Sequence, residues 1–110
     1  MASYPEFFDS VSERYQSVGF RHLSLAEQIV YCVWWLEAEV NNGGFHQFFL
    51  NSTGDLHEET VAALGAIGAE KTRTLLQRAA HEAFGMTVPT NRDERMAVLE
   101  SRRRPNGSSL

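Results

Sequence analysis

The sequence contains a single cysteine, Cys32, and no long hydrophobic run. One cysteine excludes an intrachain disulfide and a cysteine-rich metal site. The longest apolar run, residues 29–36, has eight residues, far fewer than the roughly twenty that a membrane-spanning helix needs. The N-terminus also lacks the basic start, apolar block and cleavage site of a signal peptide. We therefore expect a cytoplasmic protein that does not bind membranes.

No segment alternates between apolar and polar residues with a period of two, so no β-strand is predicted. Helical periodicity predicts an all-α fold of about six helices, two of them short. The expected helices are Tyr4–Ser17, Leu25 to about Val40, Phe45 to about Asn51, Asp55–Ile67, Ala69–Phe84 and Arg92 to about Arg103. We expect them to form a single domain over residues 1–104, followed by a flexible tail at 105–110.

Capping and apolar patterns give more detail on these helices. Ser24 and Glu27 form a capping box at the start of the central helix, and Asp55 is expected to be an N-cap. The buried face of the central helix is predicted to be Leu25, Ile29, Val33 and Leu36. The later helices are predicted to face inward through Leu75, Leu76, Ala79, Ala80, Ala83, Met96 and Leu99.

The net charge of −4 is unevenly distributed along the chain. Residues 1–70 carry ten acidic and two basic residues, whereas residues 71–110 carry four acidic and eight basic ones. A nucleic-acid-binding domain normally has a basic stripe through its folded part. Here the densest basic cluster, residues 102–104, lies just before the predicted tail, so we expect no direct binding to nucleic acid.

The acidic residues form two groups at helical spacing. Glu6, Asp9 and Glu13 share one stripe of the first helix, and Asp55, Glu58 and Glu59 make a second group. Carboxylates three or four residues apart have Cβ atoms roughly 5–6 Å from each other. Because this resembles the spacing of charges along DNA, such a face could offer a DNA-binding protein a false substrate. The alternative is an ordinary solvated face, with the second group favoured by the helix dipole.

The segment Glu39–Leu50 contains the most distinctive local pattern, Asn-Asn-Gly-Gly followed by phenylalanines. Asn and Gly accept a positive φ cheaply, which predicts a helix stop at residues 41–44. Phe45, Phe48 and Phe49 then recur at i, i+3 and i+4, which indicates a second helix and not a hairpin. We interpret the segment as a tightly packed helix–turn–helix corner.

The sequence gives no clear catalytic or metal-binding pattern. None of the four histidines, His22, His46, His57 and His81, has the spacing that places two ligands on one helix face. Cys32 lies on an apolar helix, where a thiol normally packs as a small hydrophobic group with a raised pKa. No phosphate-binding glycine motif is present. We therefore assign no catalytic residue, metal ligand or cofactor.

Residues 25–84 resemble a bacterial family of small α-helical domains that includes a DNA-mimic protein. The resemblance is carried by the segment 39–49, then by Asn51-Ser52 and Gly54, and by Ala63-Leu64 and Ile67-Gly68-Ala69. The residues of the shared motif that we assign a structural role are Glu39, Asn41, Asn42, Gly43, Gly44, Phe45, Gln47, Phe48 and Phe49.

The resemblance implies an all-helical fold and a non-enzymatic protein. The DNA mimic of this family is an acidic dimer whose carboxylates imitate DNA phosphates and bind a transcriptional repressor. This chain differs in its modest net charge and its basic C-terminal part. The family also continues with more helical sequence, so we expect either that the last elements are dispensable or that a partner chain supplies their packing.

The leading hypothesis is a non-enzymatic binding protein that presents an acidic helical surface to a basic partner, either a DNA-binding regulator or a nuclease. The candidate residues are Glu6, Asp9, Glu13, Glu37, Asp55, Glu58 and Glu59. The alternative is a small enzyme or ligand-binding domain with a polar pocket at the corner, lined by Glu39, Asn41, Asn42, His46 and Gln47. A third interpretation is a structural subunit that forms a homodimer.

Overall fold

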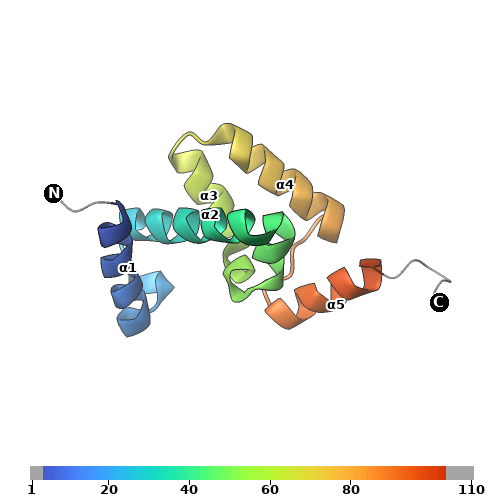
Figure 1. Cartoon of the computed structure of the whole chain (residues 1–110), viewed down its shortest axis with the longest axis horizontal. Helices are drawn as coiled ribbons and strands as arrows, with labels where there is room; N and C mark the ends of the chain where they lie inside the picture. The colour runs from blue at the N-terminus through green and yellow to red at the C-terminus, as the bar shows by residue number, and fades with distance from the viewer. Residues whose placement is uncertain (1–3, 104–110) are drawn as a thin grey trace.

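The computed structural model describes residues 4–103 and contains only helices and their connections (Figure 1). The α-helices are α1 (Tyr4–Val18), α2 (Leu25–Leu50), α3 (His57–Ala66), α4 (Glu70–Phe84) and α5 (Arg92–Arg103). Two short 3₁₀-helices, η1 (Phe20–His22) and η2 (Ser52–Leu56), flank α2. Within residues 4–103 there is no strand, and the predicted all-α fold is confirmed. The predicted tail at 105–110 lies outside the described residues.

Helix α2 is the central element of the fold. Figure 1 shows α1 packed at one end of α2, α3 and α4 along one side, and α5 near the other end. The start of α2 is the predicted capping box. The Ser24 backbone N–H donates to Glu27 Oε1 over 2.8 Å, and the Glu27 N–H donates to Ser24 Oγ over 3.1 Å. These bonds, above all the one from the Ser24 backbone, lower the pKa of Glu27.

The buried side chains form two clusters that α2 connects. The first, around the N-terminal half of α2, contains Phe8, Val11, Phe20, Leu23, Tyr31, Cys32 and Ala63. The second, around the corner, contains Leu36, Phe48, Phe49, Leu64, Leu76, Ala80 and Leu99. Because α2 is packed by different helices along its length, its apolar residues must cover several faces, which explains its nearly continuous hydrophobic sequence.

The corner differs from its prediction in where the chain turns. The helix does not stop near Val40 but continues through Asn41 and Asn42, and the break is confined to Gly43 and Gly44. Only Gly44 has a positive φ, at 74°. Asparagine tolerates the left-handed region but does not require it, so the two glycines alone make the kink.

Three further details of the prediction are wrong. Asp55 is not an N-cap but lies within η2, and the N-cap of α3 is Leu56. Leu25, the first residue of α2, is 72% exposed. Ile29 and Val33 of the same predicted stripe are partly buried, and only Leu36 is buried. Leu75 is 45% exposed, because α4 is buried through the neighbouring positions Leu76 and Ala80.

Candidate functional site

The corner buries a carboxylate, Glu39, which is only 8% exposed. The Asn51 side-chain amide donates to both carboxylate oxygens of Glu39, over 3.1 and 2.9 Å. Thr53 Oγ1 donates to Oε2 over 3.1 Å. A buried carboxylate is costly unless it receives hydrogen bonds, and these three satisfy Glu39. The carboxylate therefore fixes η2 against the end of α2.

A buried cation, Arg95 of α5, lies on the other side of η2 and is 0% exposed. Its guanidinium donates to three backbone carbonyls, those of Phe49 (2.8 Å), Asn51 (2.9 Å) and Pro89 (3.0 Å). Its Nη2 also lies 2.7 Å from Asp55 Oδ1, as an ion pair that lacks the alignment of a hydrogen bond. The carbonyls of Phe49 and Asn51 belong to the C-terminal end of α2, where the helix dipole favours a cation.

Gly54 makes this arrangement sterically feasible. A Cβ atom at this position would lie 2.8 Å from the Phe48 carbonyl oxygen and 2.9 Å from Arg95 Nε. Such contacts are shorter than van der Waals packing allows. The backbone of η2 therefore approaches Arg95 as closely as it does only because residue 54 has no side chain.

Arg95 was not among the residues predicted from the sequence, although the residue pattern of α5 contains a signal. Arg95 lies four residues before Leu99, so the two share one face of α5. Leu99 is buried, and an arginine on the buried face of a helix needs partners for its charge. Asp55 was predicted as a partner-binding residue, but in the structure it pairs with Arg95.

The five polar side chains predicted to line a pocket at the corner do not converge. Glu39 is buried against η2, whereas Asn41, Asn42 and His46 are exposed. A hollow of about 260 Å³ beside the corner does include His46, but its other lining residues are Phe45, Phe49, Ala79, Glu82, Ala83 and Leu99. The geometry therefore does not support a polar ligand site built from the motif.

The cysteine and the histidines do not form a catalytic or metal-binding cluster among the described residues. Burial raises the pKa of the Cys32 thiol to about 11, as expected for a core cysteine. His22 pairs through Nδ1 with the Val18 carbonyl over 3.0 Å, and His46 and His81 are exposed. Among residues 4–103 no three His, Cys, Asp or Glu side chains lie close enough to hold a metal ion. Over the same residues, no helix is long and apolar enough to cross a membrane.

The seven acidic candidates fall into different environments. Glu6, Asp9 and Glu13 are exposed on α1, opposite the buried Phe8 and Val11. Glu37 on α2 and Glu58 on α3 are also exposed, whereas Asp55 and Glu59 are partly buried. Glu59 pairs with Arg21 over 3.3 Å. The α1 stripe and the second acidic group are therefore separate features, and arginines already neutralise part of the second group.

Among the described residues, α5 does not expose an apolar patch at Met96 and Leu99, the feature that would favour packing by a partner chain. Leu99 is 8% exposed and belongs to the second cluster, and Met96 is half-buried. Helix α5 is instead attached to the corner by Arg95 and by Arg92, whose Nε donates to the Leu50 carbonyl over 2.8 Å.

Comparison with known proteins identifies the family of this chain. No curated protein and no solved structure matches the chain. A family model described as DMP19-like protein matches residues 21–107, which extends beyond the segment that carries the resemblance and includes α2 to α5 with the buried Glu39 and Arg95. The chain belongs to the family of DMP19-like proteins.

Proposed function

We propose that this protein is a non-enzymatic DNA mimic that presents an acidic helical surface to a basic DNA-binding regulator or nuclease. The observation that carries the proposal is the outward stripe of α1, where Glu6, Asp9 and Glu13 are exposed. Membership of the DMP19-like family supports it. In this mechanism the carboxylates compete with DNA for the phosphate-binding surface of the partner.

The packing of α1 supports this role because it determines which face is presented. Phe8 stacks on Trp34 with ring centroids 4.3 Å apart, and Tyr15 stacks on Tyr31 at 4.5 Å. These contacts at both ends of α1 restrict rotation about the helix axis. Glu6 to Glu13 covers about 10.5 Å along the helix, so the stripe is a short, rigid row of negative charge.

In this proposal, the other predicted acidic residues contribute to the partner-binding surface to different degrees. Within the described residues, no basic side chain forms an ion pair with Asp9, Glu13, Glu37 or Glu58. These residues are therefore available to a basic partner. Asp55 is held by Arg95, and Glu59 by Arg21. We propose that Glu37 and Glu58 extend the acidic surface and that Asp55 has mainly a structural role.

Capture of partners from the native cell's lysate, followed by competition, tests the proposal. A basic DNA-binding protein should be retained at low salt and released as salt rises, because exposed charge pairs are screened over about 8–10 Å. Duplex DNA should displace the purified partner. The triple variant Glu6→Gln, Asp9→Asn, Glu13→Gln should weaken binding about five- to tenfold and reduce its salt dependence.

A matched control removes the same charge from another helix. Asp93→Asn, Glu94→Gln and Glu100→Gln change three exposed acids of α5. Both triple variants therefore remove three negative charges, but this one keeps the α1 stripe. Equal weakening by both triple variants would show that net charge alone matters. Binding that is insensitive to salt or to duplex DNA would contradict the mimic function.

A further inference from the structure

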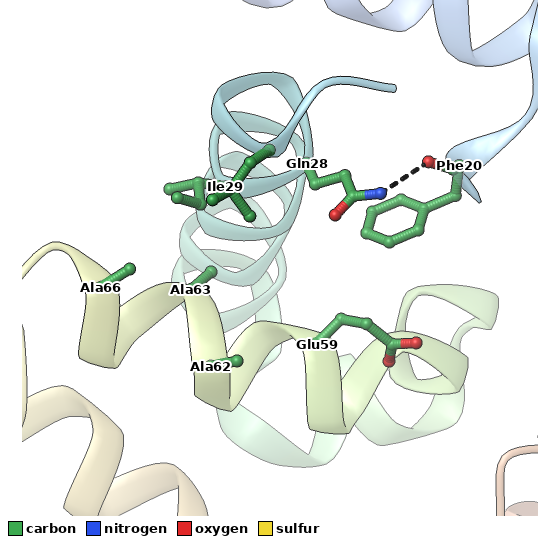
Figure 2. A pocket seen from close by; sticks show the side chains of 8 residues that line it. Phe20, Gln28, Ile29, Glu59, Ala62, Ala63 and Ala66 are labelled. Carbon is green, nitrogen blue, oxygen red and sulfur yellow. Dashed lines mark hydrogen bonds between the residues drawn. The ribbon is translucent and has the colours of Figure 1, made fainter. Parts of the chain in front are cut away.

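An apolar groove lies between the first turns of α2 and the length of α3. One hollow of about 120 Å³ is lined mainly by apolar side chains, including Leu25, Ile29, Ala62 and Ala66 (Figure 2). A second hollow of about 270 Å³ lies next to it, because Ile29 lines both. Val33 and Ile67 continue the apolar lining there. We refer to both hollows together as the α2–α3 groove.

The groove exposes large apolar side chains at its edges. Leu25 is 72% exposed and Ile67 is 53% exposed, and each lines one of the two hollows. Ala62 and Ala66, which line the first hollow, are also exposed. Isolated exposed apolar residues are common, but a continuous apolar surface with polar edges indicates a binding site for another molecule.

The charged residues along the groove are acidic. Glu59 lines the first hollow and Glu37 the second, and no lysine or arginine lines either one among the described residues. Gln28 also lines the first hollow, and its side-chain Nε2 donates a hydrogen bond to the Phe20 carbonyl over 3.1 Å (Figure 2). Arg21 pairs with Glu59, but the Arg21 side chain is 81% exposed. Such a surface pair is weak enough for a partner's cation to replace Arg21.

The dimensions of the groove suggest its occupant. A cavity of about 150 Å³ holds a benzene molecule, so the first hollow accommodates one aliphatic side chain. Leu25 and Glu37 are about 18 Å apart along α2, equivalent to roughly three turns of a partner helix. An amphipathic helix recognises a groove of this kind through apolar residues at i, i+4 and i+7.

We infer that the α2–α3 groove binds an amphipathic helix of the partner protein, with apolar residues facing Ile29 and Ala66 and lysine or arginine residues near Glu37 and Glu59. This inference rests on the proposed function for the basic character of the partner. It assigns a second contact on different helices, formed by apolar insertion and not by the α1 stripe.

The test uses the full chain and a synthetic peptide of about 14 residues, roughly four turns. The peptide carries leucines at i, i+4 and i+7 and lysines on both flanks, and a lactam bridge on its outer face keeps it helical. Fluorescence anisotropy should show saturable binding. A scrambled peptide of the same composition should bind at least about tenfold more weakly, because it has no continuous apolar face.

Variants of exposed groove residues locate the contact. Leu25→Ser and Ile67→Ser should each weaken binding about tenfold, the effect of one lost apolar contact. Ala66→Leu should also weaken binding by filling the first hollow, although it adds apolar surface. Leu75→Ser is the matched control, since Leu75 is a comparably exposed leucine on α4, and it should leave binding unchanged. Glu37→Gln should weaken binding only at low salt.

Several results would overturn the inference. The first is that the peptide does not bind, or that the scrambled peptide binds equally well. The second is that Leu75→Ser weakens peptide binding as much as Leu25→Ser or Ile67→Ser does. The third is that Ala66→Leu leaves peptide binding unchanged or makes it stronger. Sedimentation that shows dimers of the native chain and monomers of Leu25→Ser would assign the groove to a second copy instead. The α1 triple variant should bind the peptide normally, so failure here and failure of the proposed function are distinguishable.

Discussion

Glu39 and Arg95, the two buried charged residues of the described chain, are linked through Asn51. The Asn51 side-chain amide donates to Glu39, while the Asn51 backbone carbonyl accepts from Arg95 over 2.9 Å. The anion comes from α2 and the cation from α5, and η2 lies between them. The corner is thus stabilised from two sides by opposite charges, each of which has its own set of hydrogen-bond partners.

Removal of the Glu39 carboxylate should destabilise the fold. Glu39→Gln keeps the shape but loses one acceptor and the charge, so we expect a loss of about 1–2 kcal/mol in the free energy of unfolding. Glu39→Ala should cost about 3 kcal/mol, because the Asn51 and Thr53 donors would then lack partners. Urea unfolding measures both. As a control, Glu37→Gln changes an exposed glutamate on the same helix and should alter the free energy of unfolding by no more than about 0.5 kcal/mol. If Glu37→Gln destabilised the protein as much as Glu39→Gln, the role given to Glu39 would be refuted.

Replacement of Arg95 should have a larger effect. Arg95→Met should cost about 3–5 kcal/mol, because it leaves one buried and two partly buried carbonyls, and Asp55, without their cation. Arg95→Lys should recover only part of this, since an ammonium cannot match the planar fork of the guanidinium. Urea unfolding gives the free energies, and Arg78→Met on the exposed face of α4 is the control. Retention of native stability by Arg95→Met would contradict the interpretation of the buried cation.

The features that were predictable from the sequence depend on residues close together in the chain. The Ser24–Glu27 capping box, the end of α1 before Gly19 and the helical spacing of Phe45, Phe48 and Phe49 all involve neighbours within about one turn. Burial of Cys32 also followed from its apolar neighbours.

The features that were missed depend on distant contacts. Arg95 binds the Phe49 carbonyl, 46 residues away in the chain. Asp55 looked like an N-cap because acidic residues follow it, but its ion pair with Arg95 becomes visible only when α5 is placed against η2. Local propensity gave way here to tertiary packing. Glu39 is buried by partners 12 and 14 residues away, Asn51 and Thr53, whereas Asn41 and Asn42 of the same motif are exposed.

Gly44 of the corner and Gly54 of η2 should respond differently to replacement by alanine. At Gly44 a Cβ would meet nothing within 4 Å, so only its φ of 74° opposes the change, and we expect Gly44→Ala to cost about 1–2 kcal/mol. Gly54→Ala should cost about 3 kcal/mol or more, because the methyl group would collide with the Phe48 carbonyl and Arg95.

A double-mutant cycle separates the two causes for the glycines. Gly54→Ala combined with Arg95→Met should cost less than the sum of the single changes, because methionine lacks the Cζ of Arg95 and makes no hydrogen bonds that hold its end against residue 54. Gly44→Ala combined with Arg95→Met should be closer to additive. Thermal or urea unfolding of the single and double variants provides the measurement, and additive costs for the Gly54 pair would exclude a steric conflict with Arg95.

Stability should fall on mild acidification because of His57. Burial lowers the pKa of this imidazole below its ordinary value of about 6.5, and nearby Arg95 lowers it further, while Glu58 acts in the opposite direction. Nδ1 of His57 is buried without a hydrogen-bond partner among the described residues. Well above pH 6.5 the imidazole is neutral in both the folded and the unfolded state, so it causes no pH dependence there.

Below that pH the unfolded chain takes up a proton at His57 while the folded chain does not. The free energy of unfolding should therefore fall by up to about 1.4 kcal/mol per pH unit, until the pH reaches the lowered pKa of the folded state. Urea unfolding at pH 7.5 and at pH values between 6.5 and 5 measures this slope. His57→Gln should flatten it, whereas His46→Gln, at an exposed position, should leave it intact. A slope that persists in His57→Gln would assign the effect to other groups. Glu27 cannot account for it, because the stability that its lowered pKa contributes is lost only below about pH 4.5.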